Sequence, residues 1–426
     1  MKKFGSLCLI LVMGLITLAG CSKKESPGNG AGSTEPFTLK VTYKGGSTPK
    51  DLLDKGLDIF TQQSGIPAEV VFIPGSWADY ITKLQTMIAG GDIVDTCTVA
   101  IEGFELMVKS GMAVPVDDWI AQHKAEWDAV VNDINPMVMD FMKFDGKLYG
   151  PPNEWNNIVT HLNTDLLKEA GLPLPPPDWG KEQFLEYAQK LTHKRPDGTT
   201  QYGCFVPNYY FGFEAWLYNN NAAYMTADFK KSMLLDPAVV EMFQFMYDLI
   251  YKYQVAPIPE PGLNSTRMLE EGNVAMIWAG RWVTSNYVRD GFKNVAVQYV
   301  PNFKTNVTIW GGQGVFTLKA TKHPEEATSL AIFLASRPWV ETIMEYGAIP
   351  VLNSVAAQVV PALGIPQNAE LFFNSAPVIK PVQAPATYAE CANLVSGVMS
   401  DILINRADLM TTLKAAEVEL NSILMD

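Results

Sequence analysis

The regular alternation of strand-like and helix-like segments between residues 37 and 110 constrains the fold most strongly. Residues 37–43 alternate apolar and polar side chains, and β-branched runs at residues 69–73 and 93–99 indicate two further strands. Apolar residues at helical spacing occupy the intervals. Strands that alternate with helices predict βαβ units in a mostly parallel sheet, where ligands bind beyond the C-terminal strand ends. These ends fall at residues 44–48, 74–80 and 99–102.

The rest of the chain continues this mixture of strands and helices. Runs typical of strands occupy residues 158–162, 274–278, 294–300 and 308–318. The last of these contains Gly311, Gly312 and Gly314, which permit a bend or a close backbone approach. From about residue 387 the chain is largely helical. At 426 residues it is too long for a single core, so we expect an α/β protein with two lobes.

A short extended passage at residues 147–163 has the composition of a crossing between two such lobes. Gly150 and the two prolines after it break regular structure, and a strand-like run follows at residues 158–162. Between them, residues 154–157 supply a carboxylate, an indole and two amides. These side chains are suited to line a gap between lobes. The alternative is an ordinary surface loop before a strand.

The N-terminus has the pattern of a secreted and lipid-anchored protein. Residues 1–20 begin with two lysines and continue in a mostly apolar, uncharged run that ends in small residues, which is typical of a signal peptide. Small residues directly before Cys21 resemble a bacterial lipobox, which implies cleavage there and a lipid on the Cys21 thiol. Residues 21–36 then predict a flexible tether. The alternative is a plain secretory signal with an incidental cysteine.

Composition excludes several classes of function. An apolar content of 48% with 18% charged residues is typical of a globular protein. The formal net charge is −13, and the predicted signal peptide would take two lysines with it. This acidity argues against binding nucleic acid or an anionic membrane surface. The three cysteines after Cys21, namely Cys97, Cys204 and Cys391, are far apart, so we expect buried, unpaired thiols, or one disulfide and one free thiol.

Motifs for catalysis or cofactor binding are absent from the sequence. It contains no phosphate-binding loop, no Gly-x-Ser-x-Gly and no His-Glu-x-x-His, and no cysteine or histidine pair has metal-site spacing. The four histidines are scattered along the chain. We therefore expect no enzyme, no cofactor and no metal.

Several stretches, taken in order, resemble one family of transport proteins. They are Trp-Ala-Asp-Tyr-Ile-Thr-Lys-Leu at residues 77–84 with Ala-Gly-Gly-Asp-Ile-Val-Asp at 89–95, Gly-Lys-Leu-Tyr-Gly-Pro-Pro at 146–152, Asn-Thr-Asp-Leu-Leu-Lys-Glu-Ala-Gly-Leu-Pro at 163–173, Glu-Gly-Asn-Val-Ala-Met at 271–276 with Gly-Arg-Trp at 280–282, and Trp-Gly-Gly-Gln-Gly at 310–314. Together they resemble the extracellular solute-binding proteins of ABC importers, in the sugar-binding family that includes maltose-binding proteins. Residues 91–95 depart slightly from the family's usual Gly-x-x-Pro-Asp.

The resemblance implies a two-lobe periplasmic-binding-protein fold of type II with the ligand cleft between the lobes. It places residues 37–152 and 313–347 in the N-terminal lobe, and residues 153–312 and 348–426 in the C-terminal lobe. It also implies a monomer on the outer face of the cell membrane that passes a carbohydrate to the transmembrane subunits of a permease.

Candidate site residues follow from the resemblance and from the chemistry of sugars. Indoles stack on the C–H face of a sugar ring, while carboxylates and amides bind its hydroxyls. The candidates at the crossing, the strand ends and the glycine break are Trp77, Tyr80, Glu102, Trp155, Asn156, Trp282, Trp310 and Gly311. We add Ser47, Trp216 and Tyr388. For each aromatic residue the alternative is core packing, and for Glu102 it is a solvated loop carboxylate.

Two other functions compete with carbohydrate transport. A lipid-anchored glycoside hydrolase would also be rich in tryptophan, but it needs two carboxylates on either side of the scissile bond, and no motif marks such a pair. The same fold could instead bind a non-sugar solute such as a polyamine, because a polyamine site also combines acidic and aromatic side chains.

Overall fold

The computed structural model describes residues 36–44, 50–75, 77–343 and 347–425. The predicted signal peptide, Cys21 and nearly all of the predicted tether lie outside the described residues, and so does Ser47. Residues 37–426 belong to one unit of the chain. Among the described residues, no helix has both the length and the apolar character needed to cross a bilayer.

Within the described residues, the larger sheet has seven strands in the order β13-β6-β12-β3-β1-β2, with β14 paired to β12. Their bounds are β1 (Leu39–Lys44), β2 (Ala68–Ile73), β3 (Thr96–Ala100), β6 (Pro152–Asn156), β12 (Thr308–Thr317), β13 (Ile349–Pro350) and β14 (Ile379–Pro381). We call this sheet, with the helices packed on it, the first lobe.

The prediction of a mostly parallel sheet is wrong, because the larger sheet contains both parallel and antiparallel pairs of strands. Strand β1 is parallel to β2 and β3, as the βαβ pattern predicts, but β12 is antiparallel to both β3 and β6. Parallel neighbours need a crossover connection such as a helix. Strands β6 and β12 instead adjoin connections to the other sheet, so their direction is not set by a crossover helix.

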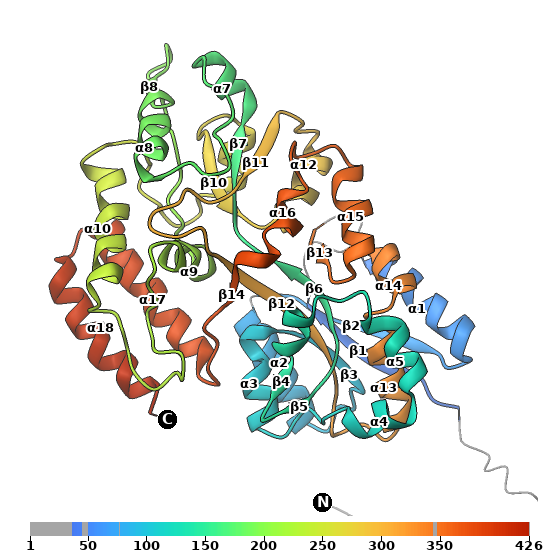
Figure 1. The fold of residues 1–426 in the computed structure, drawn as a ribbon. Coiled ribbons are helices and arrows are strands. Elements are labelled where there is room, and N and C mark those ends of the chain that lie inside the picture. Colours follow the sequence, from blue (N-terminus) through green and yellow to red (C-terminus); the bar gives the residue numbers. More distant parts are fainter. Residues whose placement is uncertain (1–35, 45–49, 76, 344–346, 426) are drawn as a thin grey trace, which may run out of the picture. The chain divides into compact units, whose positions relative to one another are not determined.

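Helices of the first lobe pack on both faces of this sheet (Figure 1). They are α1 (Lys50–Ser64), α2 (Trp77–Ala89), α3 (Ile101–Lys109), α13 (Pro324–Phe333) and α14 (Arg337–Ile343), with α4 (Asp117–Gln122), α5 (Lys124–Val131), α6 (Pro136–Asp140) and α15 (Asn353–Ala362) beside them and a small hairpin of β4 (Lys143–Phe144) and β5 (Lys147–Leu148). Helix α1 illustrates the cause: Leu53, Leu57 and Phe60 recur on one helical face and are buried.

The second lobe is built around an antiparallel sheet in the order β10-β7-β11. Its strands are β7 (Val159–Asn163), β10 (Met276–Ala279) and β11 (Val295–Gln298), and β8 (His193–Lys194) pairs with β9 (Thr200–Gln201). The helices are α7 (Thr164–Glu169), α8 (Lys181–Lys190), α9 (Tyr210–Asn219), α10 (Pro237–Tyr251), α11 (Ser265–Glu270), η1 (Arg281–Val283), α12 (Thr284–Asp290), α16 (Leu371–Asn374), η2 (Ala376–Val378), α17 (Tyr388–Leu403) and α18 (Leu409–Ile423).

The first crossing between the sheets lies where the sequence predicts one. Asn156 pairs with Gly311 in the larger sheet, and Val159 pairs with Ala279 in the smaller one, so the chain crosses within a few residues. The strand expected at residues 158–162 is confirmed as β7. Within the predicted extended passage, Glu154 and its neighbours form strand β6.

The three cysteines among the described residues are free and buried in separate parts of the fold, so the expectation of unpaired thiols is confirmed. Cys97 lies in β3 and Cys391 in α17, while Cys204 follows β9.

Candidate ligand-binding cleft

A cavity of about 370 Å³ lies between elements of the two lobes. Its volume falls in the range of small-molecule sites. It is lined by Tyr43, Lys44, Trp77, Ala100, Glu102, Glu154, Trp155, Asn156, Tyr209, Tyr210, Phe211, Trp282, Gly311, Gly312, Gln313 and Ala348. The first lobe contributes its strand ends and the strands β6 and β12, whereas the second lobe contributes the start of α9 and η1.

Strand direction explains why the first-lobe residues meet here. Strands β1 and β3 are parallel, so their C-terminal ends lie at the same edge of the sheet. Lys44 ends β1, and Ala100 ends β3 just before Glu102 in the first turn of α3. Trp77 begins α2. The strand ends singled out in the sequence therefore do line the cavity.

Two glycines allow the aromatic wall of the second lobe to form. A Cβ on Gly280 would lie 2.1 Å from the ring of Trp282, so only glycine lets this indole fold back over the turn. A Cβ on Gly311 would lie 2.5 Å from the ring of Phe211. The Phe211 and Trp282 ring centroids are 6.0 Å apart and the rings are inclined at 60°, a favourable edge-on arrangement of two aromatic rings.

Glu102 is the most unusual polar group in the cavity wall. It is only 8% exposed, and its Oε1 accepts a hydrogen bond from the Tyr210 hydroxyl at 2.9 Å. Its Oε2 is buried and has no partner among the described residues. Burial raises the pKa of this carboxyl, while a hydrogen bond from its own backbone amide, the Tyr210 hydrogen bond and the Lys44 charge oppose the rise. Such a buried acceptor is costly unless another molecule donates to it.

Glu154 provides a second acidic group, beside Lys44. Burial raises the pKa of Glu154 to about 7, against the opposing effects of the Lys44 charge and a hydrogen bond with Tyr43. Burial also lowers the pKa of Lys44, which faces Glu154 and Glu102 and lies 5.2 Å above the Trp77 ring. The cavity thus combines two carboxylates, one ammonium group and several aromatic faces.

Arg281 links the cavity floor to both lobes. Its backbone amide donates to Asn156 Oδ1 at 3.1 Å, and its Nη1 donates to the Ala348 carbonyl at 2.6 Å. Burial lowers the pKa of this guanidinium to about 10, so it stays charged at neutral pH. Asn156 is therefore already partly satisfied within the protein.

Six of the predicted site residues line the cavity, namely Trp77, Glu102, Trp155, Asn156, Trp282 and Gly311. Four others do not: Tyr80, Trp216, Trp310 and Tyr388. The structure describes no position for Ser47.

Those four aromatic residues support the wall or the core. Tyr80 is fully buried, with its hydroxyl 2.7 Å from Thr42 Oγ1 and its ring against Trp77. Trp216 packs on Trp278, and Trp310 packs on Phe141.

Tyr388 lies in α17, with its ring 5.0 Å from that of Tyr210. For Trp216 and Trp310, the alternative to ligand contact, namely core packing, is the correct interpretation.

Sequence reasoning missed several lining residues. Glu154 was within the crossing stretch but was not singled out beside Trp155 and Asn156. Residues 209–211 are three consecutive aromatic residues, Tyr-Tyr-Phe, at the start of α9. That run could have been noticed, but its contact with the first lobe depends on folding that no local pattern reveals.

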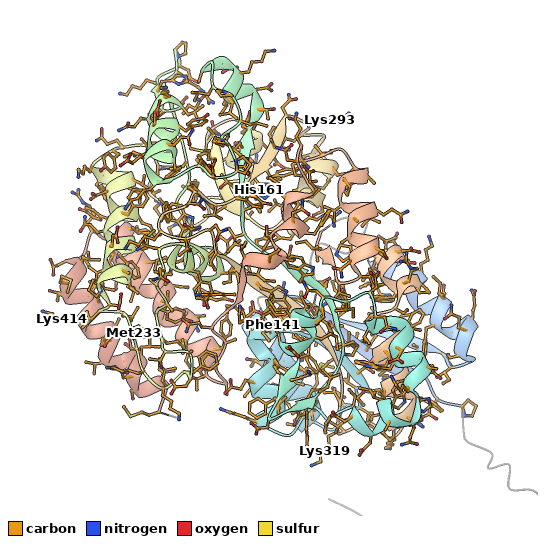
Figure 2. The ribbon with its side chains drawn as sticks, in the orientation of Figure 1. Phe141, His161, Met233, Lys293, Lys319 and Lys414 are labelled. Carbon is orange, nitrogen blue, oxygen red and sulfur yellow. The ribbon has the colours of Figure 1, made fainter. Side chains whose placement is uncertain are left out.

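His161 illustrates why the histidines carry no chemistry in this cleft. Figure 2 shows it inside the second lobe, and it is fully buried in β7. Its Nε2 lies 3.2 Å from the Ala279 carbonyl and must donate, so its Nδ1 accepts from the Tyr287 hydroxyl at 3.0 Å. Burial lowers its pKa to about 3. It is a neutral, structural histidine.

Comparison with known proteins places the fold and the site in context. Residues 56–372 match the model of a family described as bacterial extracellular solute-binding protein. The chain belongs to this family. Its members are solute-binding proteins and not enzymes, in agreement with the expectation from the sequence.

Relatives of this solute-binding protein include a characterised protein and several solved structures. The arabinooligosaccharide-binding protein of Bacillus subtilis (strain 168) is 24% identical over 358 residues, which are 78% of this chain and 76% of the relative.

An ABC substrate-binding protein of Listeria monocytogenes in complex with cycloalternan has a TM-score of 0.81 at 23% identity and covers 90% of this chain and 98% of its own. Maltose-bound MalE3 of T. maritima has a TM-score of 0.74 at 18% identity, with coverage of 91% and 99%. These structures share the two-lobe fold.

Proposed function

We propose that the cleft binds a carbohydrate, an oligosaccharide in particular, and that the protein delivers it to an ABC importer. The observation that carries the proposal is the presence, in one cavity, of aromatic faces and of the buried Glu102 Oε2, which has no partner among the described residues. A sugar ring presents an apolar face for stacking and hydroxyl groups that donate to such an acceptor. The ligands named for the relatives, an arabinooligosaccharide, cycloalternan and maltose, are all saccharides.

The proposed contacts are the lining residues that offer a suitable group. They are Trp77, Glu102, Glu154, Trp155, Asn156, Trp282 and Gly311. We leave out Tyr80, Trp216, Trp310 and Tyr388, which lie behind the wall, while Ser47 stays a prediction.

The proposed lobes differ slightly from the boundaries expected from the sequence. We take the first lobe as residues 37–156, 313–350 and the segment that follows β13, because Asn156 and Ile349 both pair within the larger sheet. The second lobe holds residues 159–307 and the chain from about residue 367, where Gln367 bridges to Ala296, except for β14, which pairs with β12 in the larger sheet. The remaining residues form the crossings. We propose that the lobes rotate around these crossings and so close on the ligand.

We also propose that the mature protein is a monomer held at the extracellular face of the cell membrane by a lipid on Cys21. The support is the lipobox-like sequence before Cys21 and the tether composition after it. The variant Cys21→Ser should appear in the culture medium as a monomer, with unchanged ligand affinity. Retention of the variant in the membrane fraction would contradict the anchor without affecting the proposed ligand.

A thermal-shift panel tests the ligand class. Arabino-, malto- and manno-oligosaccharides are compared with spermidine and putrescine, because the two cavity carboxylates also suit a cation. A ligand that binds only the folded form at a concentration of a hundred times its Kd stabilises by about 2.7 kcal/mol. We expect at least one neutral oligosaccharide to raise the melting temperature, with a smaller rise in the variant Trp282→Ala. A shift with polyamines alone would replace the carbohydrate proposal.

A further inference from the structure

The hydrogen bond between Tyr210 and Glu102 joins the two lobes at the cavity wall. Glu102 belongs to the first lobe, in the first turn of α3 after β3. Tyr210 begins α9, which belongs to the second lobe because Trp216 on this helix packs against Trp278 of β10. Neither residue lies in a segment that crosses between the sheets. Their contact therefore depends on how the lobes approach each other.

The neighbouring tyrosine makes the contrast clear. The Tyr209 hydroxyl also points to a hydrogen-bond acceptor, the Trp278 carbonyl at 3.1 Å, but that acceptor lies in the same lobe. Opening of the lobes would leave the Tyr209 bond intact and would break the Tyr210 bond. The Tyr209 hydrogen bond therefore does not depend on closure of the lobes, whereas the Tyr210 hydrogen bond does.

The same bond determines which oxygen of Glu102 is left for a ligand. With Oε1 held by the Tyr210 hydroxyl, the remaining acceptor is Oε2, which is buried and unpartnered among the described residues. The surroundings of this carboxylate offer few substitutes: the titratable groups that act on it or respond to it are Lys44, Tyr210, Tyr388 and Glu214. Closure without a ligand thus buries an unsatisfied acceptor, and closure around a donor satisfies it.

We propose that the Tyr210 hydroxyl is a latch that joins the second lobe to Glu102 on closure and holds Oε2 of that carboxylate toward the ligand. Tyr210 is in this sense a positioning residue, since it acts through Glu102. The bond favours the closed state, and the ligand adds its own donor only in that state. Ligand binding and closure are then coupled through one carboxylate, as a differential contact between two states requires. For the identity of the ligand, the inference rests on the proposed carbohydrate function.

The variant Tyr210→Phe removes the hydroxyl and keeps the ring. With the oligosaccharide found in the thermal-shift panel, stopped-flow kinetics should show a dissociation rate raised about tenfold, which corresponds to about 1.4 kcal/mol, and an association rate within about twofold of the parent. The matched control is Tyr187→Phe, which removes a buried hydroxyl that donates to the Pro173 carbonyl within the second lobe. The control should leave both rates unchanged.

A double-mutant cycle separates a latch from a merely structural role. In a Glu102→Ala background the hydroxyl has no acceptor, so Tyr210→Phe should have no further effect on the dissociation rate. An equal tenfold effect in both backgrounds would overturn the proposal, as would a Tyr210→Phe protein with the kinetics of the parent. If Tyr210→Phe fails to fold, Tyr210→Leu removes the same hydroxyl; it should also raise the dissociation rate, and this effect should be lost in the Glu102→Ala background.

A ligand-free measurement distinguishes failure of the latch from failure of the carbohydrate proposal. Lys319 and Lys293 are exposed on the first and second lobes (Figure 2), and their replacement by cysteine gives two sites for spin labels, while the native described cysteines are buried. The distance distribution without ligand should contain less of the short, closed component in Tyr210→Phe than in the parent or in Tyr187→Phe. Identical distributions would overturn the latch even if carbohydrate binds.

Discussion

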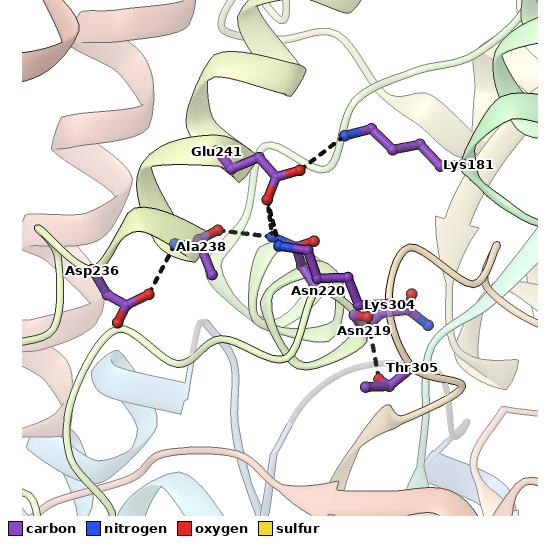
Figure 3. Close-up of polar contacts among 8 residues, drawn as sticks. All are labelled: Lys181, Asn219, Asn220, Asp236, Ala238, Glu241, Lys304 and Thr305. Atoms are coloured by element: carbon purple, nitrogen blue, oxygen red, sulfur yellow. Dashed lines mark hydrogen bonds and ion pairs between the residues drawn. The ribbon is translucent and has the colours of Figure 1, made fainter.

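The two ends of helix α9 use carboxylates in opposite ways. At its start, Tyr210 donates to Glu102, which keeps a second oxygen buried and without a described partner. At its C-terminal end, Asn220 donates to Glu241 at 3.2 Å, and Lys181 and Lys304 approach the same carboxylate at 3.3 and 2.5 Å (Figure 3). These contacts lower the pKa of Glu241 to about 2, chiefly through Lys304.

The difference shows which end of the helix is built for a ligand. The Glu241 cluster is complete: Asn220 also donates to the Ala238 carbonyl at 2.9 Å, so that α9 and α10 are joined by satisfied contacts (Figure 3). The Glu102 carboxylate is incomplete, and its raised pKa reports the cost of its burial. A protein that only needed stability would not keep an unsatisfied acceptor beside a cavity.

The largest expected effect is on ligand affinity in Glu102→Ala. The Tyr210 hydroxyl and a ligand hydroxyl both lose a charged acceptor, so binding should weaken by about 3 kcal/mol, roughly a hundredfold. The melting temperature should stay the same or rise. Titration calorimetry and thermal unfolding measure the two effects, and Glu241→Ala serves as the matched control with parental affinity. A Glu102→Ala protein with parental affinity would contradict the contrast between the two carboxylates.

The pH dependence of stability should differ in sign between Glu154 and Glu241. The pKa of Glu154 is raised to about 7 from an ordinary value of 4.5, so the folded state binds its proton more tightly than the unfolded state. Stability therefore falls as pH rises between these values. Glu241, with its lowered pKa, loses its contribution only as pH falls below about 4.5 toward about 2.

Unfolding of the parent and of Glu154→Gln at about pH 5 and about pH 8 checks this prediction. Relative to the variant, the parent should lose about 2 kcal/mol between the two conditions, once partial exposure is allowed for. The two groups that face Glu154, Tyr43 and Lys44, are unchanged in the variant. A parent that gains stability over the variant on this rise in pH would show that the carboxyl is not held protonated by burial.

A smaller effect is expected when the aromatic wall is shortened. Trp282 is partly exposed in the cavity, so Trp282→Ala removes stacking area without opening the core, and affinity should fall by about 1.4 kcal/mol, or tenfold. Trp155 makes a less clean test, because it is only 5% exposed and its loss would also lower stability. Calorimetric titration with an unchanged Kd in Trp282→Ala would remove this indole from the site.

The smallest effect is expected at the surface cluster. Glu241→Gln keeps the shape of the side chain and removes its charge, and solvent screening limits the loss to about 0.5–1 kcal/mol of folding stability. Urea unfolding at low and high salt should show the loss mainly at low salt. A changed ligand affinity in this variant would mean that the Glu241 cluster influences the cavity. That result would contradict the separate roles of the two ends of α9.

The sequence predicted those parts of the cleft that depend on local patterns. Strand ends and the crossing are visible as breaks in periodicity, which is why Trp77, Glu102, Trp155 and Asn156 were found. Trp282 was found because it follows a glycine turn after a strand and matches the Gly-Arg-Trp stretch that resembles the family. Strand direction was not predictable beyond the βαβ units, so the antiparallel insertion of β12 was missed.

The rest depends on contacts between the lobes. Tyr210 belongs to the site only because α9 meets α3, at a separation of 108 residues. Trp216 and Trp310 have the same chemistry as the cavity indoles, but they lie on buried faces, and composition cannot distinguish the two environments. The aromatic residues of a sequence are candidates for a wall, and the fold decides which of them face the cavity.

The most direct test of the account is calorimetric titration with the saccharide selected by the thermal-shift panel, followed by chromatography of the recovered sugar. The account predicts saturable binding of one ligand per chain, a Kd weakened roughly a hundredfold in Glu102→Ala, and a sugar recovered intact. Absence of binding by every saccharide, or recovery of cleaved sugar, would contradict it.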